Sequence, residues 1–426
     1  MTPEIEKRIK AVQAGRVPAG YKKSKIGIVP KDWGEVRFHD MFSRVVRKNK
    51  EGNTNVLTIS AQYGLINQND FFNKTVASDD KSNYYLMKKG EFAYNKSYSN
   101  GYPFGALKRL DFYDKGIVSP LYICFAASEN NQCPDFYVHY FEAGLMNKEI
   151  QAFAQEGARN HGLLNISVDD FFNSNLLNPP LSEQKKIAEI LATQDRVIEL
   201  KEKLIAEKQS QKKYLTQTYL MGKMRSAFFQ KKWKYVYLSE ILKERKECNE
   251  LENLRICSVA VNNGVVDQKE HLGKSMAAEN TSNYAVVHYG DIVYTKSPTG
   301  TFPYGIIKQS QLKENVAVSP LYGVYEPYCY EIGYLLQVYF SYANNANNYL
   351  KPIVNKGAKN TILISNQTFL KPSLYLPIDI EEIKYLYKIF KSADEEISLL
   401  QKDLEQEKLK KKSLMQLLLT GLVRVA

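Results

Sequence analysis

The chain repeats itself at an interval of 200 residues. The segment Gly90–Ser97 (GEFAYNKS) recurs as Gly290–Ser297 (GDIVYTKS), and Val118–Tyr122 (VSPLY) recurs unchanged as Val318–Tyr322. The register between these segments has no gap, and the only two tryptophans of the chain are also 200 residues apart. A repeat of this length implies that one complete structural unit was duplicated, so the chain should fold as two similar halves.

Each half has two parts with different compositions. Residues 33–180 and 233–377 are rich in Tyr, Phe, Ile, Val and Asn punctuated by Gly and Pro, which is typical of α+β domains with many short strands and loops. The stretches 182–221 and 379–420 contain no Gly or Pro. Each of them predicts a single helix of about 40 residues, or about 60 Å. The predicted fold class is therefore α+β, with two pseudo-repeated domains separated by two long helices.

The ends of the two predicted helices are marked by capping residues. Ser182 and Asp379 are expected to cap the first free amides of their helices. Gly222 and Gly421, each within a Gly-x-x-Arg sequence, are expected to end the helices in the left-handed conformation.

Both predicted helices carry apolar residues at alternating spacings of three and four, interrupted by polar residues such as Gln194 and Glu407. Such stripes indicate that the two helices bury them against each other; the alternative is that each stripe packs on its own domain. The predicted seam comprises Ile187, Leu191, Ile198, Ile205, Leu215 and Tyr219 on the first helix, and Leu386, Phe390, Ile397, Leu400, Leu404, Leu414 and Leu418 on the second.

The charge of the chain favours a polyanionic partner. Its 58 Lys and Arg residues against 46 Asp and Glu residues give a net charge of +12, which points first to nucleic acid. No apolar run approaches the roughly 18 residues of a membrane helix, and the charged start does not resemble a secretory signal, so a cytoplasmic protein without membrane contact is expected. The five cysteines lack CxxC spacing and are expected to be reduced.

Motifs for catalysis are incomplete. Asn178–Leu181 (NPPL) approaches the Asn-Pro-Pro-aromatic motif of adenine methyltransferases, but leucine replaces the ring that would stack on the flipped base. Gly273–Ser275 ends like a phosphate-binding loop but lacks the glycine five residues earlier, and the five histidines have no metal-site spacing. We therefore predict a chain that is not an enzyme and holds no cofactor or metal.

Two segments in each half combine cations, amides, aromatics and glycine as DNA-binding loops do: 94–105 and 157–162, matched by 294–305 and 357–361. Positions that the halves share suit a grip on the DNA backbone, and positions that differ could read different bases. The alternative is that the shared Gly, Pro and Tyr residues only shape turns and core. The candidate DNA-binding residues are Lys96, Ser97, Tyr98, Ser99, Asn100, Lys108, Arg159, Asn160 and His161 in the first half, and Lys296, Ser297, Thr299, Lys308, Lys359, Asn360 and Thr361 in the second.

The chain resembles the DNA specificity subunits of type I restriction–modification systems. Pro179–Leu191 (PPLSEQKKIAEIL) is similar to the signature that opens their central helix, while Gly90–Gly105 and Glu156–Ser167 are similar to their target-recognition domains; the second half departs from the helix signature at Asp379–Lys384. The resemblance implies that the helices form an antiparallel coiled-coil spacer between two recognition domains, which read an asymmetric bipartite DNA target with an unread gap. On this interpretation, inserting four residues near Ile205 should lengthen the preferred gap.

The resemblance also implies the partners. They are double-stranded DNA, modification subunits that methylate adenine, expected to number two, and restriction subunits that translocate DNA with ATP and cut it. Exposed residues around Lys185, Lys186 and Glu189 are candidates for docking the modification subunits. The domains implied are 1–180, the N-terminal segment with the first recognition domain; 181–222, the first spacer helix; 223–378, the second recognition domain; and 379–426, the second spacer helix.

Three other functions stay open at this stage. A combined restriction–methylation enzyme would need a methyl-donor loop and a complete Asn-Pro-Pro-aromatic motif. A coiled-coil scaffold that does not read DNA would leave the basic surplus and the divergent loops unexplained. A related system that methylates without restriction would differ only in other genes.

Overall fold

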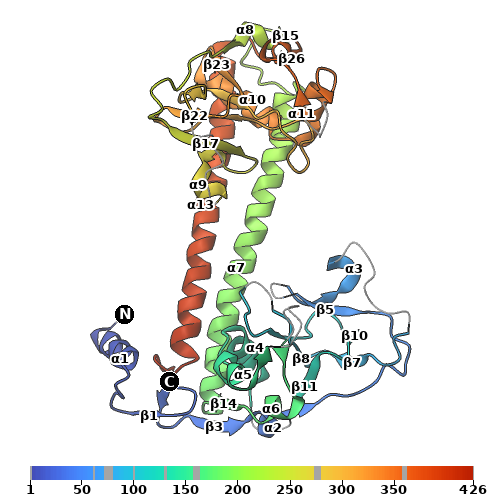
Figure 1. The fold of residues 1–426 in the computed structure, drawn as a ribbon, viewed down its shortest axis with the longest axis vertical. Helices are drawn as coiled ribbons and strands as arrows, with labels where there is room; N and C mark the ends of the chain where they lie inside the picture. The colour runs from blue at the N-terminus through green and yellow to red at the C-terminus, as the bar shows by residue number, and fades with distance from the viewer. Residues whose placement is uncertain are drawn as a thin grey trace. The chain divides into compact units, whose positions relative to one another are not determined.

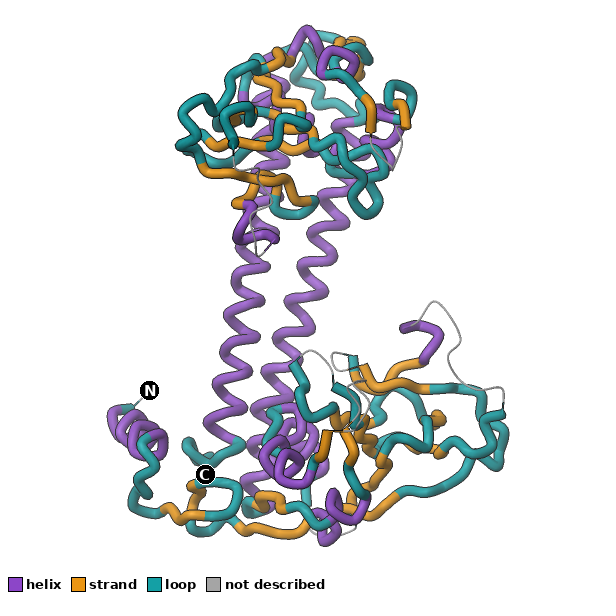
Figure 2. The backbone as a smooth tube through the Cα atoms, in the orientation of Figure 1, coloured by secondary structure: helices purple, strands orange, loops and turns teal. Residues whose placement is uncertain are grey.

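The computed structural model divides into two compact units, formed by residues 1–201 with 403–426 and by residues 202–402. Figure 1 labels elements of both units, and Figure 2 distinguishes their helices, strands and loops by colour. The structure describes residues 2–60, 63–71, 80–98, 101–128, 132–156, 164–272, 280–356 and 362–425.

The first unit is built around an antiparallel four-stranded sheet in the order β4-β11-β8-β9. Two further strand pairs, β5-β6 and β7-β10, are linked to each other by a single parallel bridge between Val56 and Ile117. A third pair, β3-β14, joins the beginning of the strand-rich segment 33–180 to its end. The strand bounds are Gly34–Arg37 (β3), Phe42–Arg44 (β4), Leu57–Ser60 (β5), Gly64–Asn67 (β6), Tyr85–Lys88 (β7), Phe92–Asn95 (β8), Ala106–Arg109 (β9), Lys115–Val118 (β10), Ile123–Ala127 (β11) and Asn175–Asn178 (β14).

The second unit repeats this topology 200 residues later. Its antiparallel sheet has the order β16-β23-β20-β21, and its second sheet, β18-β17-β22-β19, contains the parallel pair β17-β22 at the position of the single bridge in the first unit. The equivalent terminal pair is β15-β26. The strand bounds are Lys234–Tyr237 (β15), Leu242–Glu244 (β16), Arg255–Ala260 (β17), Gly264–Asp267 (β18), Ala285–Val287 (β19), Ile292–Tyr294 (β20), Ile307–Gln309 (β21), Val316–Val318 (β22), Gly323–Pro327 (β23) and Ser373–Leu376 (β26).

Short helices and small hairpins complete each unit. In the first unit, helix α1 and the hairpin β1-β2 contact the C-terminal residues, because the Tyr21 hydroxyl donates to the carbonyl of Gly421 over 2.6 Å. These elements are α1 (Pro3–Gln13), β1 (Tyr21–Lys23), β2 (Ile28–Pro30), α2 (Phe38–Met41), α3 (Gln68–Phe71), α4 (Pro134–Glu142), α5 (Asn147–Phe153), β12 (Gln155–Glu156), β13 (Leu164–Asn165), α6 (Val168–Phe172), α8 (Leu238–Ile241), α9 (Gln268–Leu272), α10 (Tyr330–Phe340), α11 (Ala343–Leu350), β24 (Asn355–Lys356), β25 (Ile362–Leu363) and α12 (Asn366–Phe369).

Aromatic residues form the core of the first unit. Phe38, Phe92 and Phe125 are fully buried, and the rings of Phe92 and Phe125 stack at 5.3 Å across neighbouring strands. Such pairs stabilise a sheet beyond the area they bury. The core of the second unit has more aliphatic residues and includes the stacked pair Tyr294 and Phe369 at 4.9 Å.

The two long helices are α7 (Leu181–Leu215), which continues as one π-helical turn, η1 (Thr216–Leu220), and α13 (Ile380–Leu418). Their direction is antiparallel within each unit, because residues that rise in number on α7 pair with residues that fall on α13. In the first unit Gln194 pairs with Glu407, and Lys201 pairs with Asp403. The described chain therefore has the predicted α+β class with an antiparallel helix pair.

The helix ends confirm three of the four predicted caps. The Asp379 side chain accepts from the amide of Glu381 over 3.1 Å, and Gly222 and Gly421 adopt φ values of +66° and +68°. The prediction for Ser182 was wrong, because α7 already begins at Leu181 and the amide of Glu183 bonds to the carbonyl of Pro180. Pro180 directly precedes the helix, and its carbonyl accepts from the amides of Glu183 and Gln184.

An arginine beyond each helix end clamps a buried glutamate at the start of the other helix. Arg424 forms two bonds with Glu183, at 2.7 and 2.8 Å, and two with Asp32, and it lowers the pKa of the Asp32 carboxyl. In the second unit Arg225 forms two bonds with Glu382, at 3.0 and 2.6 Å. These arginines come from the repeated Gly-x-x-Arg sequence, so the motif connects the two helices of each unit.

Candidate nucleic-acid interface

Half of the predicted DNA-binding residues lie in described parts of the chain. Ser99, Asn100, Arg159, Asn160, His161, Lys359, Asn360 and Thr361 lie outside the described residues. The others, Lys96, Ser97, Tyr98 and Lys108 with Lys296, Ser297, Thr299 and Lys308, divide into two groups that the structure places differently.

The first group follows the end of a central strand in each sheet. Strand β8 pairs with β11 through Tyr94 and Ile123, so Lys96 and Ser97 leave the sheet at the end where the turn before Ile123 enters it. The amide of Leu164 donates to the carbonyl of Lys96 over 3.0 Å and brings β13 to the same place. Three segments thus meet at this end of the sheet. The second unit has the same strand pairing at this end, with Tyr294 paired to Gly323.

A glycine fixes the path of the chain at this end in both units. Gly105 has a φ of +82°, and a Cβ atom there would lie 2.2 Å from the carbonyl oxygen of Asn95. The hydroxyl of Tyr94 donates to the carbonyl of Phe104 over 2.6 Å, and Tyr294 bonds to Tyr304 in the same way. These shared Gly and Tyr residues therefore serve the architecture, as the alternative interpretation of the sequence allowed.

The exposed side chains of this group differ between the units. Tyr98 is 62% exposed, whereas Lys296 is partly buried with its Nζ 2.5 Å from Oδ1 of Asn366. Burial lowers the pKa of Lys296, with the nearby carboxylate of Glu244 opposing it. Lys296 also has a positive φ of 51°, a backbone conformation that residues other than glycine rarely adopt. Such strain is typical of positions that a site holds in a fixed orientation.

The remaining residues of the group are small and polar. Ser97 is bonded within its own loop, since its amide donates to Oδ1 of Asn95 over 3.1 Å. The hydroxyl of Ser297 donates to the carbonyl of Thr295, and Thr299 forms a two-way backbone pair with Phe302 at the tip of a hairpin. Thr299 therefore sits on a defined turn rather than in the sheet.

Lys108 and Lys308 form the second group, on the last strand of each four-stranded sheet, β9 and β21. Lys108 forms an ion pair with Glu142 of α4, and its Nζ lies 4.9 Å from the centre of the Tyr102 ring. Its side chain is only 12% exposed. Lys108 is therefore engaged by its own domain.

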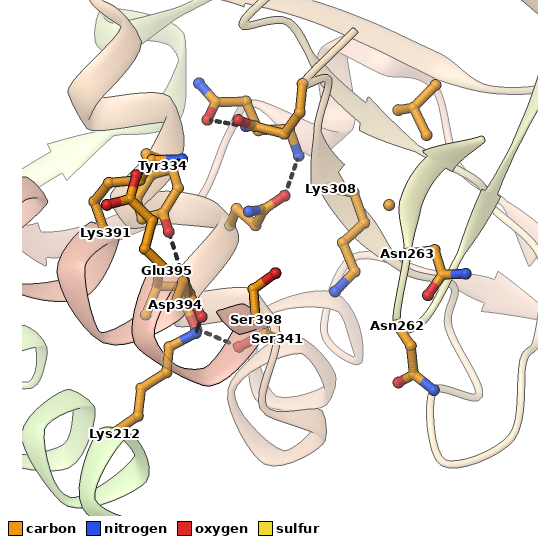
Figure 3. Close-up of a pocket in the computed structure, with 16 residues that line it drawn as sticks. Lys212, Asn262, Asn263, Lys308, Tyr334, Ser341, Lys391, Asp394, Glu395 and Ser398 are labelled. Atoms are coloured by element: carbon orange, nitrogen blue, oxygen red, sulfur yellow. Dashed lines mark hydrogen bonds and ion pairs between the residues drawn. The ribbon is translucent and has the colours of Figure 1, made fainter. Parts of the chain in front are cut away.

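Lys308 instead projects into a cavity of about 440 Å³, opposite Asn262 and Asn263 (Figure 3). Burial lowers the pKa of Lys308, the nearby Lys212 lowers it further, and Asp394 opposes both. Within the described residues, Lys308 has no ion-pair partner of the kind that Glu142 provides to Lys108. The cavity is lined by Lys212, Asn262, Asn263, Gly264, Val265, Lys308, Gln309, Gln311, Tyr334, Gln337, Val338, Ser341, Lys391, Asp394, Glu395 and Ser398.

The predicted seam residues fall into two groups. Those near the helix ends pack into the domain cores, as the alternative interpretation expected. Those in the middle of the helices are buried or half-buried outside these cores. Ile187, Leu191 and Leu418 belong to the core of the first unit with Leu414 against it, and Leu386 and Phe390 belong to the core of the second with Leu215 and Tyr219 against it. Ile205, Ile397 and Leu404 are buried, and Ile198 and Leu400 are half-buried.

Polar and charged pairs join the helices at positions that the sequence presents only as interruptions of the apolar stripe. Nε2 of Gln194, which is buried, donates to Oε2 of Glu407 over 2.7 Å, and Nζ of Lys208 lies 2.6 Å from Oε1 of Glu396. Lys411 pairs with Asp195 in the first unit, and Lys212 pairs with Asp394 at the equivalent position of the second. Lysines on one helix and acidic residues at the matching positions of the other were a sequence signal for these pairs, and the sequence analysis missed it.

The structure gives the Asn-Pro-Pro-Leu segment a structural role. The side chain of Gln184 donates both to Oδ1 of Asn178 and to the carbonyl of Pro179, each over 2.8 Å, at the entry to α7. Across the described residues, no group of three or more His, Cys, Asp and Glu side chains is arranged to hold a metal ion. No described helix is long and apolar enough to span a membrane.

Comparison with known proteins supports this description. Residues 30–208 match the model of the type I restriction modification DNA specificity domain. The matched model describes a DNA specificity domain, in agreement with the DNA-recognition role expected from the sequence.

Three solved structures are similar over most of the chain, each at 15% identity. One, described as the structural basis of complex assembly and conformational transition of the type I R-M system, has a TM-score of 0.53 and covers 93% of this chain and 99% of its own. The S subunit from M. genitalium has a TM-score of 0.51 and covers 91% of this chain and 96% of its own. The HsdS subunit from Thermoanaerobacter tengcongensis has a TM-score of 0.45 and covers 93% and 98%.

The matched domain spans the first recognition segment and most of α7, and the fold of the two solved structures with TM-scores above 0.5 extends over both halves. Residues 30–208 therefore match the type I restriction modification DNA specificity domain, and the chain as a whole is similar in fold to these two solved structures.

Proposed function

We propose that this chain reads an asymmetric, bipartite DNA target through its two recognition repeats and docks the modification and restriction subunits of a type I system. The observation that carries the proposal is the duplication of one fold with different residues at equivalent loop positions, such as Tyr98 against Pro298. A pseudo-twofold protein meets two half-sites on opposite strands of a duplex. Because the loops differ, the half-sites should differ.

The proposed domains are those expected from the sequence, with recognition domains at 1–180 and 223–378 and spacer helices at 181–222 and 379–426. The DNA contacts proposed are the segments at the sheet ends, with Lys96, Ser97 and Tyr98 in one repeat and Ser297 and Thr299 in the other. The eight candidates outside the described residues stay in this proposal on sequence grounds.

The exposed face of α7 is proposed to dock a modification subunit. Lys185, Lys186 and Glu189 are all exposed, while Ile187 between them is buried in the domain core. A charge on such a face can select a partner without affecting the fold. Lys185→Glu with Lys186→Glu is expected to release a modification subunit while the melting temperature stays unchanged.

The test of function is methylome sequencing of cells that express this chain with its cognate modification subunit. We expect N6-methyladenine at a single asymmetric motif with a fixed gap. Tyr98→Ala is expected to relax or weaken one half-site and Thr299→Ala the other. Tyr235→Ala, an exposed tyrosine on β15, serves as the control and should leave the motif unchanged. No new motif with an active and bound modification subunit would favour the scaffold function instead.

The gap is tested by lengthening both helices. Four residues inserted after Ile205, with four inserted after Leu399, keep the flanking pairs Lys201–Asp403 and Lys208–Glu396 in register. Four helical residues add about 6 Å, which is close to two base pairs. The methylated motif should then show a gap about two base pairs longer, and an unchanged gap would contradict the role of the helices as a ruler.

A further inference from the structure

The turn that joins the two sheets of each repeat has the same sequence in both, Val-Ser-Pro-Leu-Tyr. Most of its residues have a structural task. Val118 and Val318 are fully buried, and the carbonyl of Ser119 accepts from the amide of Tyr122 over 3.1 Å, as Ser319 does from Tyr322 over 3.0 Å. Proline suits the first central position of such a turn.

The leucine of this turn has no such task. Leu121 is 62% exposed and Leu321 is 73% exposed, so neither side chain contributes appreciably to a core. Two exposed leucines at the same position of the same turn, in repeats whose neighbouring loops differ, indicate a contact outside the chain. A partner that meets both repeats in the same way would explain why both keep the residue.

The register places this turn at the proposed DNA-binding end of each sheet. Ile123 pairs with Tyr94. Leu121 lies two residues before Ile123, and Lys96 lies two residues after Tyr94, so both are at the same end of the sheet. In the second repeat Gly323 pairs with Tyr294 and places Leu321 in the same relation to Lys296. The leucines therefore lie beside the segments in which the repeats differ.

We propose that Leu121 and Leu321 contact the DNA duplex, each in its own half-site, through an apolar contact with sugars or with the edge of a base step. This proposal rests on the proposed function. Because the two half-sites differ but the leucines do not, the contact does not select bases. Apolar side chains contact DNA in this way when they pack in a groove or wedge a base step open.

The experiment uses the complex of this chain with its cognate modification subunits and a duplex carrying the methylated motif. Leu121→Ser and Leu321→Ser are each expected to raise the Kd by roughly tenfold, because the burial of one leucine is lost. The dependence of log Kd on log salt should keep its slope, since no phosphate contact is removed. A duplex without the motif should lose affinity by a similar factor.

Leu251→Ser is the matched control. Leu251 is 83% exposed, but its equivalent in the first repeat is Glu51, so no shared contact is expected and its Kd should match that of the wild type. Equal melting temperatures will show that all three variants fold.

Each other outcome overturns the proposal. If both turn variants bind DNA with wild-type affinity, the leucines do not contact DNA. If analytical ultracentrifugation shows that the variants lose modification subunits from the complex, the leucines dock a protein instead. If the wild-type complex itself shows no preference for the motif, the proposed function fails and this inference fails with it.

Discussion

Lys108 and Lys308 occupy the same position in the two repeats, yet their surroundings differ. Lys108 is held by Glu142 and the ring of Tyr102, whereas Lys308 extends into a polar cavity, where burial and Lys212 lower its pKa. The strand that carries them is the same, so the fold keeps the position and the neighbours decide its chemistry. A residue shared by two repeats is therefore not by itself evidence of a shared function.

The helix clamps show the same contrast. Glu183 accepts from Arg424 and also from the indole Nε1 of Trp33 over 2.9 Å. Glu382 accepts from Arg225, and the indole Nε1 of Trp233 has no hydrogen-bond partner among the described protein atoms. The first clamp is thus distributed over two donors, and the second depends on one arginine.

The largest expected effect comes from breaking the second clamp. Arg225→Ala leaves the buried carboxylate of Glu382 without its arginine, which should cost about 3 to 5 kcal/mol of unfolding free energy. Arg424→Ala should cost less, because Trp33 still donates to Glu183. Calorimetric unfolding of both variants measures the difference.

A second substitution separates the loss of a charge pair from the loss of packing. Adding Glu382→Gln to Arg225→Ala removes the unpaired charge and should restore a large part of the stability. Equal losses in the two single variants, or no recovery in the double variant, would contradict the comparison between the clamps.

An intermediate effect is expected at the two equivalent lysines. Lys108→Met removes a partly buried ion pair and should cost about 1 to 2 kcal/mol. Lys308→Met removes a desolvated and unpaired charge, so it should leave stability unchanged or raise it by a few tenths of a kcal/mol up to about 1 kcal/mol. Urea unfolding at neutral pH measures both.

The unfolding free energy should depend on pH through Lys308. Burial lowers the pKa of Lys308 in the folded state, so between the folded and unfolded pKa values the unfolded chain binds more protons and wild-type stability rises with pH. The difference between the wild type and Lys308→Met should therefore shrink as the pH rises toward 10. A difference that grows would mean that Lys308 has a counter-charge after all.

Most of the fold could be predicted because it depends on local patterns and on the repeat. The glycines at 222 and 421 end the helices as expected, since a left-handed residue has few alternatives to glycine. The start of α7 was predicted one residue too late, because proline and serine both suit a helix start and only the backbone bond from Glu183 to Pro180 distinguishes them. The seam was harder, since helix residues near each end pack on the domain as well.

The candidate site was less predictable, because it depends on contacts between residues far apart in the sequence. Nothing near Lys108 in the chain reveals that Glu142 forms an ion pair with it, and nothing near Lys308 reveals that it forms no such ion pair within the described residues. The leucines of the shared turn could have been found from the repeat, had exposure been known. Repeats identify positions, and the packing around each position determines its role.

The smallest expected effect distinguishes the units by pH. His139 is buried, its Nδ1 lies 3.8 Å from Oδ2 of Asp195, and the equivalent Asp394 instead accepts from the hydroxyl of Tyr334. Burial lowers the pKa of His139; Asp195 opposes the change, Lys411 adds to it, and Asp135 and Glu142 oppose it weakly. Because its folded pKa lies below the unfolded value near 6.5, His139 destabilises the first unit progressively as the pH falls through 6.5.

Hydrogen exchange at pH 7.5, 6.5 and 5.5 should show α4 losing protection relative to α10, and His139→Phe should abolish that difference. Equal behaviour of α4 and α10 in the wild type would mean that His139 titrates in the folded state as it does in the unfolded chain.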